Sequence, residues 1–418
     1  MDEGRKPIHQ PDQLIVDLQS WDVIRAELAD LHVGFSQADE HAGLGLVRLR
    51  DLTDSEGEPL GVDELLAELR QVFAAQRDGF IPAMGKNRFV DSIIGLGHKI
   101  MAGGVMELGT KIMAGEVAAK AHKIMGGALP APAAESDLIP VEMPPAAAGG
   151  GEGVRIGLVD TPILAATAES LDVHVVGDAV LAVGPDPLPY RAGHGTFVSG
   201  IVRRQAPKAE IFLAPALAGA NARADSWDVA TAMMALVDEQ RVDILNVSLG
   251  CFALGGGAPL VMSRAIERIG SRALVVAAAG NHGNFTGLMR GRTSGSAIWP
   301  AAIPAAVAVG SCDKLGNRSV FSPDQQWVDC LALGEEVVSN YLTDVEFPST
   351  ADPADAPAAT TAHFGHGLAR WNGTSFSTAM VSGAIAARTV PGTTTTTGAF
   401  TTLLAESHVV AQGDQLRA

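Results

Sequence analysis

The sequence has few of the features that mark secreted, membrane-spanning or disulfide-rich proteins. Its 418 residues include only three cysteines, Cys251, Cys312 and Cys330, and an odd, sparse set of cysteines is not a disulfide framework. No uninterrupted apolar stretch reaches the length that spans a bilayer. Residues 1–10 lack the apolar core of a secretory signal. Unless a leader has been removed, these absences favour a cytoplasmic protein.

Basic residues are also scarce. Lysine and arginine number 30 against 47 aspartates and glutamates, which gives a net charge of -17. A surface this acidic repels phosphates over most of its area, so nucleic acid is excluded as a partner. The hydrophobic fraction of 47% is ordinary for a globular protein with a sizeable core, and the length suits two or more domains.

Residues 1–80 predict a small α+β domain. Short branched runs typical of strands alternate with amphipathic patterns typical of helices, and Ser20 is the expected N-cap of the first helix. The strand-like runs are "QLIVDL" and "GLGLVRLRDL", and the helical ones are "SWDVIRAELADLH" and "GVDELLAELRQVFAAQR".

Residues 81–128 contain an internal repeat. "KIM" begins at Lys99, Lys111 and Lys123, 12 residues apart. Twelve residues advance the face of an ideal helix by about 120°, so one straight helix would not keep the copies on one stripe. We expect short helices, broken at glycines, that pack on a neighbour. A membrane-surface or self-association segment is the alternative, which the Lys, Ile and Met content permits without requiring.

Residues 129–152 are rich in proline, alanine and glycine, a composition that predicts an accessible linker. We expect this linker to be a site of proteolytic cleavage.

Residues 153–418 predict a separate α/β domain. Apolar, branched runs such as "VRIGLVD", "VDILNVSLG" and "ALVVAAAGN" alternate with helical patterns such as "SWDVATAMMALVDEQR". Runs that are apolar throughout indicate strands buried on both faces, hence a mostly parallel sheet with helices on both faces. Active sites in such sheets lie at the carboxyl ends of the strands.

Four residues of this domain lie at predicted strand ends or helix starts: Asp160, His194, Asn281 and Ser375. Each alone has an ordinary structural interpretation, namely a turn aspartate, a loop histidine, a turn asparagine and an N-cap serine. Together they supply an orienting carboxylate, a base, an amide donor for an oxyanion, and a nucleophile at a helix N-terminus.

These residues lie in motifs that resemble those of the subtilisin-like serine peptidases. The motifs are "GLVDT", "GHGTFVSG", "NVSLG", "AAAGN" and "NGTSFSTAMVSG". The chain departs from the family pattern at two positions. Pro162 stands where the family usually has glycine, and Ala379 stands where it usually has proline.

The resemblance implies roles for these residues. Ser375 would attack the substrate carbonyl, His194 would take and return the proton, Asp160 would orient the imidazole, and Asn281 would bind the oxyanion. The substrate-binding residues would be Ser248, Leu249, Gly250, Ala277, Ala278 and Ala279. Because these walls are small and uncharged, we expect an apolar or medium-sized residue before the cleaved bond.

No cofactor is implied by the resemblance. Calcium often stabilises members of this family, but no compact acidic loop indicates a calcium site. The tract "HFGHG" places His363 and His366 three residues apart in a predicted loop, which is usually not a metal site, and the five threonines at 393–397 are typical of a loop.

The resulting prediction is a serine endopeptidase that cleaves peptide or protein substrates through an acyl-enzyme. Residues 1–128 would restrain it, as a prodomain-like unit removed by autoprocessing, or would dock a regulatory protein. Two alternatives use the same fold: an inactive peptidase-fold binding module, and an esterase or acyltransferase with the same triad.

Overall fold

The computed structural model describes residues 8–76, 79–92, 129–138, 149–182, 184, 186–218, 222–253, 257–285, 292–347, 360–406 and 410–411. The three "KIM" copies lie outside these residues. Among the helices that are described, none is long and apolar enough to cross a membrane.

The larger part of the molecule is built on an eight-stranded sheet in the order β20-β15-β14-β13-β11-β6-β9-β7. All neighbouring strands are parallel except β20, which is antiparallel to β15. This confirms the predicted mostly parallel sheet. The strands are β6 (Arg155–Asp160), β7 (Val173–Val175), β9 (Glu210–Pro215), β11 (Ile244–Val247), β13 (Leu274–Ala278), β14 (Val307–Cys312), β15 (Cys330–Leu333) and β20 (Val410–Ala411).

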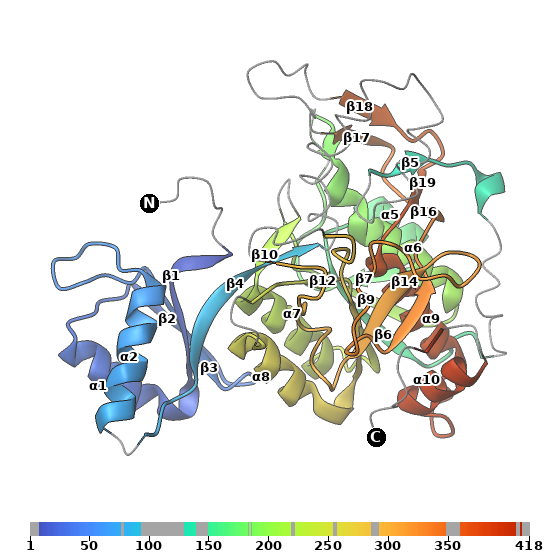
Figure 1. The fold of residues 1–418 in the computed structure, drawn as a ribbon. Coiled ribbons are helices and arrows are strands. Elements are labelled where there is room, and N and C mark those ends of the chain that lie inside the picture. The colour runs from blue at the N-terminus through green and yellow to red at the C-terminus, as the bar shows by residue number, and fades with distance from the viewer. Residues whose placement is uncertain are drawn as a thin grey trace.

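Helices cover both faces of this sheet (Figure 1). On β6, Leu158 packs with residues of α6 (His194–Gln205) and α9 (Thr374–Arg388), whereas Val159 packs with residues of α7 (Ser226–Asp238) and α8 (Leu260–Ile269). Successive residues of a strand point to opposite faces, so a strand covered on both sides reads as a continuous apolar run. Further elements of the larger domain are α5 (Ala165–Ser170), β8 (Leu188–Pro189), η4 (Tyr190–Gly193), η5 (Gly270–Arg272), β17 (Asp344–Phe347), β18 (Thr360–His363) and α10 (Thr396–Ala405), and η1 (Leu18–Ser20) belongs to the N-terminal unit.

The N-terminal part is an α+β unit with the strand order β4-β1-β3-β2. Alternate residues of β1 face opposite ways. Leu14 and Val16 pack with the unit's own helices, and Ile15 packs with residues of α7 and α8. The unit therefore buries one face of its sheet against the larger domain. Its elements are β1 (His9–Asp17), α1 (Trp21–Asp30), β2 (Gln37–His41), β3 (Leu46–Arg50), α2 (Val62–Gln76) and β4 (Met84–Ser92).

Strand β4 extends this unit beyond the expected boundary at residue 80 and joins it to the larger domain. Its first half pairs with β1, and its second half lies between β10 (Arg223–Asp225) and β12 (Leu249–Gly250), antiparallel to both. Figure 1 shows β4 running from the N-terminal unit to β10 and β12. A single sheet thus spans both parts of the molecule.

Part of the predicted linker forms a strand on the larger domain, although Pro132 in that strand stays exposed. Strand β5 (Ala131–Pro132) pairs with β19 (Leu368–Trp371), which in turn pairs with β16 (Val337–Asn340). The side chain of Ala133 is buried beside the same sheet. Proline and alanine are compatible with an edge strand, so the composition of this segment did not distinguish a linker from a docked strand.

Candidate active site

Asp160 and His194 meet at the carboxyl end of the central sheet. Asp160 is the last residue of β6 and His194 is the first residue of α6, and both side chains are fully buried. His194 Nδ1 lies 2.7 Å from Asp160 Oδ1. Because a carboxylate accepts, Nδ1 carries the proton and donates it, which leaves Nε2 as the basic nitrogen. Nε2 has no partner among the residues described. Pro162, which stands where the family usually has glycine, therefore does not prevent the contact between Asp160 and His194.

Ser375 lies in the first turn of α9 and its side chain is buried. Its hydroxyl donates to the backbone carbonyl of Ser248 at 3.1 Å, and the Ser248 hydroxyl donates to the Ser375 carbonyl at 3.0 Å. The hydroxyl is therefore directed at the segment between β11 and β12 and not at His194. Helix α9 continues unbroken through Ala379, the second departure from the family pattern.

Asn281 follows β13 and is linked to the residue before Ser375. Its Oδ1 accepts hydrogen bonds from the N–H of Thr374 at 3.0 Å and from the Thr374 hydroxyl at 3.2 Å. These two bonds fix the amide, and its buried Nδ2 has no partner within the described part of the chain. An amide donor is thus held next to the start of α9.

Aromatic side chains enclose the imidazole. The ring centroid of His194 lies 5.7 Å from that of Phe376 and 6.1 Å from that of Trp371. Phe376 directly follows Ser375 in the chain, so the base and the nucleophile candidate share one buried environment. The sequence analysis did not select these aromatics, although Trp371 directly precedes the serine motif and Phe376 lies within it.

The six predicted substrate-binding residues lie on two neighbouring segments. Leu249 and Gly250 form β12, Ser248 precedes them, and Ala277, Ala278 and Ala279 lie at the end of β13 and just after it. Strand β4 already occupies the edge of β12, with Ser92 opposite Leu249 and Asp91 opposite Gly250. The sequence carried no motif for this contact.

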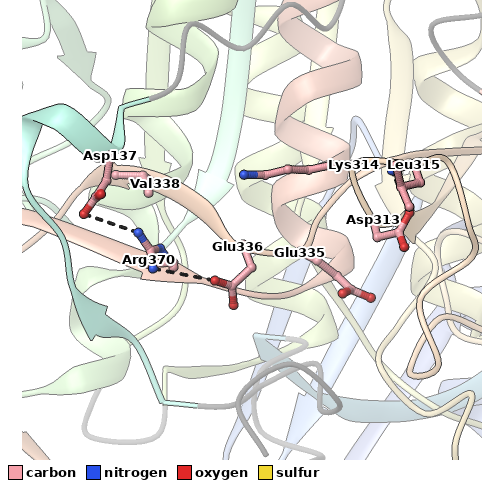
Figure 2. Close-up of a pocket in the computed structure, with 8 residues that line it drawn as sticks. All are labelled: Asp137, Asp313, Lys314, Leu315, Glu335, Glu336, Val338 and Arg370. Carbon is pink, nitrogen blue, oxygen red and sulfur yellow. Dashed lines mark hydrogen bonds and ion pairs between the residues drawn. The ribbon is translucent and has the colours of Figure 1, made fainter. Parts of the chain in front are cut away.

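A separate cavity of about 410 Å³ lies beside β16 and β19 (Figure 2). Arg370 there forms ion pairs with Asp137 at 3.3 Å and with Glu336 at 3.7 Å. None of the predicted catalytic or substrate-binding residues lines it. The lining residues are Asp137, Asp313, Lys314, Leu315, Glu335, Glu336, Val338 and Arg370.

One histidine of the "HFGHG" tract is paired with a carboxylate of β17. His363 Nδ1 lies 2.7 Å from Asp344 Oδ1. Within the described residues, no group of three or more histidines, cysteines or carboxylates is placed to hold a metal ion.

The mostly parallel α/β sheet carries a paired Asp and His at its carboxyl end and a serine at a helix N-terminus. The subtilase family matches residues 151–393, which is more than half of the chain. The chain belongs to the subtilase family, and its fold is subtilisin-like.

Known relatives are peptidases. Subtilisin DY of Bacillus licheniformis is 27% identical over 223 residues, which cover 50% of this chain and 76% of the relative. Subtilisin Savinase of Lederbergia lenta is 29% identical over 201 residues, which cover 46% and 67%. The solved structure of a cold-adapted subtilisin-like serine proteinase has a TM-score of 0.44 and 22% identity, covering 61% of this chain and 82% of that one. Membership of the subtilase family, together with the similarity to these subtilisins, makes the chain a serine endopeptidase.

Proposed function

We propose that Asp160, His194 and Ser375 form the catalytic triad of this endopeptidase and that Asn281 donates to the oxyanion. The observation that carries the proposal is the 2.7 Å bond between His194 Nδ1 and Asp160 Oδ1, with Nε2 left without a partner. That arrangement selects the tautomer in which Nε2 accepts a proton.

The reaction requires the Ser375 hydroxyl to leave the Ser248 carbonyl by rotation about χ1, so that it donates to His194 Nε2. Oγ then attacks the substrate carbonyl, and the proton passes to Nε2. Negative charge develops on the carbonyl oxygen, which Asn281 Nδ2 and the Ser375 N–H stabilise. His194 returns the proton to the leaving amine. A water molecule then gives a proton to His194 and attacks the acyl-enzyme, which releases the product acid and returns the proton to Ser375.

We also propose that the N-terminal unit restrains this site. The second half of β4 pairs with β12, and β12 follows Ser248, whose carbonyl accepts the Ser375 hydroxyl. A peptide substrate would bind by adding a strand to the same edge of β12. Because one edge holds one strand, a docked β4 excludes substrate. Autoprocessing is part of this proposal, and we expect the cut outside residues 129–138, because β5 is already paired with β19.

The test is digestion of a mixed peptide library with the full chain, read by mass spectrometry, beside a Ser375→Ala control and a set of matched esters. Cleaved peptides that are absent from the control support the endopeptidase. Ester turnover without peptide turnover would assign an esterase instead. No turnover of either kind, together with no labelling of Ser375 by a fluorophosphonate, would assign a binding module, because restraint by β4 leaves the serine activated.

A further inference from the structure

Strand β19 presents different residues to its two faces. Ala369 and Trp371 point inward and are almost completely buried in the main core. Leu368 and Arg370 point to the opposite, outer face, because successive residues of a strand alternate. The inner face reaches the candidate active site, since the ring centroid of Trp371 lies 6.1 Å from that of His194.

The outer face of β19 is covered by residues 131–138, which we call the covering segment. Ala133 of this segment is buried in a small apolar cluster with Leu368 and with Val338 of β16. Its N–H donates to the Leu368 carbonyl at 3.3 Å, which continues the pairing of β5 with β19. The covering segment lies outside the residues that the subtilase family matches, so its packing is a feature of this chain.

Arg370 holds the far end of the covering segment (Figure 2). Its guanidinium lies 3.3 Å from Asp137 Oδ2 and 3.7 Å from Glu336 Oε2. Asp137 Oδ2 also accepts the Ala134 N–H at 3.0 Å, so the covering segment itself orients the carboxylate. The ion pair with Asp137 is partly exposed and therefore contributes little alone. The strand pairing and the burial of Ala133 carry most of the docking.

We infer that the covering segment positions the catalytic histidine by holding β19, and with it the Trp371 ring, against His194. This inference rests on the proposed function. The ring of Trp371 also lies 5.3 Å from that of Phe376, the residue after Ser375. A displaced β19 would therefore disturb the packing of both the base and the nucleophile. Cleavage within the covering segment should inactivate the peptidase, whereas loss of the restraining N-terminal unit should activate it.

Ala133→Asp in the full chain tests this role, because a charge in that buried apolar contact disfavours docking. The measurements are the rate of labelling by a fluorophosphonate, and kcat and KM for one peptide. The labelling rate and kcat should fall about tenfold or more, since a misplacement of about 1 Å costs up to about 100-fold. KM should stay within about twofold, because β12 belongs to a different sheet from β19.

Ser136→Asp is the matched control, since it adds the same charge at an exposed residue of the covering segment and should leave both rates unchanged. Asp137→Arg, which turns a like charge toward Arg370, replaces Ala133→Asp if that variant does not fold. Wild-type rates in both Ala133→Asp and Asp137→Arg, an equal loss in Ser136→Asp, or a change in KM alone would overturn the inference while labelling of Ser375 upheld the triad.

A double-variant cycle shows whether the covering segment acts through Trp371. Trp371→Leu should slow labelling by itself, and adding Ala133→Asp to it should cause little further loss, because both changes remove one interaction. Fully additive losses would overturn positioning through Trp371. A wild-type chain that neither cleaves peptides nor reacts with a fluorophosphonate would overturn the proposed function, and the inference with it.

Discussion

Asn87 of the N-terminal unit caps a helix of the peptidase domain at Trp227. The fully buried Asn87 Oδ1 accepts the Trp227 N–H at 3.1 Å and the Ser226 hydroxyl at 2.9 Å, at the N-terminus of α7. Asn87 lies on β4, so the same residue positions the strand that enters the substrate edge. Docking of the unit and stability of α7 are therefore coupled.

Asn87→Ala should raise the peptidase activity of the full chain. The change removes both bonds to α7 and leaves the buried Trp227 N–H unpaired, which costs about 1–3 kcal/mol of docking free energy. A loss of about 1.4 kcal/mol corresponds to a tenfold rise in the fraction of undocked, active enzyme. Initial rates on a fluorogenic peptide measure this rise. A rate equal to or below that of the wild type would contradict the restraining role of β4.

The ion pair between Asp17 and Arg264 should contribute to the same docking. Arg264 Nη2 lies 2.9 Å from Asp17 Oδ1 across the interface, and both side chains are largely buried. Arg264→Asp should raise activity, because two like charges then face each other. The swapped double variant Asp17→Arg/Arg264→Asp should restore most of the restraint. Activity in the double variant as high as in Arg264→Asp would show that the pair does not hold the interface.

His282 should make the protein less stable in acid. Burial lowers the pKa of His282 from 6.5 to about 4. Between these values the unfolded chain binds the proton more readily than the folded one. The free energy of unfolding therefore falls as pH drops through this window, by up to about 3 kcal/mol for this group.

The check on His282 is urea unfolding on either side of that window. His282 Nε2 lies 2.8 Å from the Ser296 carbonyl. The His282→Gln variant keeps a donor for this carbonyl but has no titrating group at the position, so the stability of the variant should depend less on pH. His366→Gln changes an exposed histidine and should match the wild type. Equal pH dependence in the wild type and His282→Gln would exclude His282 as a source of acid sensitivity.

The sequence predicted the elements whose chemistry is local. The apolar runs of the parallel strands were visible because each strand is covered on both faces, and the catalytic candidates lie at strand ends or helix starts within short motifs. The apolar run Leu14-Ile15-Val16 in β1 carried the same signal of burial on both faces. It did not indicate that α7 and α8 of the larger domain cover the second face.

Long-range contacts were not predictable in this way. The pairing of β4 with β12 joins residues more than 150 positions apart, and no pattern in the residues of β4 specifies that partner. The contact between Ile298 and Gly250 is also not visible in the sequence, because only the folded chain brings the two residues together. The threonine run at 393–397 was expected to be a loop, but α10 begins at Thr396, because Thr395 accepts the Gly398 N–H and caps the helix.

The central claim is that Asp160, His194 and Ser375 act together. The most direct test is the rate at which a fluorophosphonate labels the full chain, with the labelled residue mapped by mass spectrometry. We predict labelling on Ser375 alone, none in Ser375→Ala, and a rate reduced on the order of 10³-fold or more in a folded His194→Ala variant. Labelling of another residue, or an unchanged rate without His194, would contradict the account.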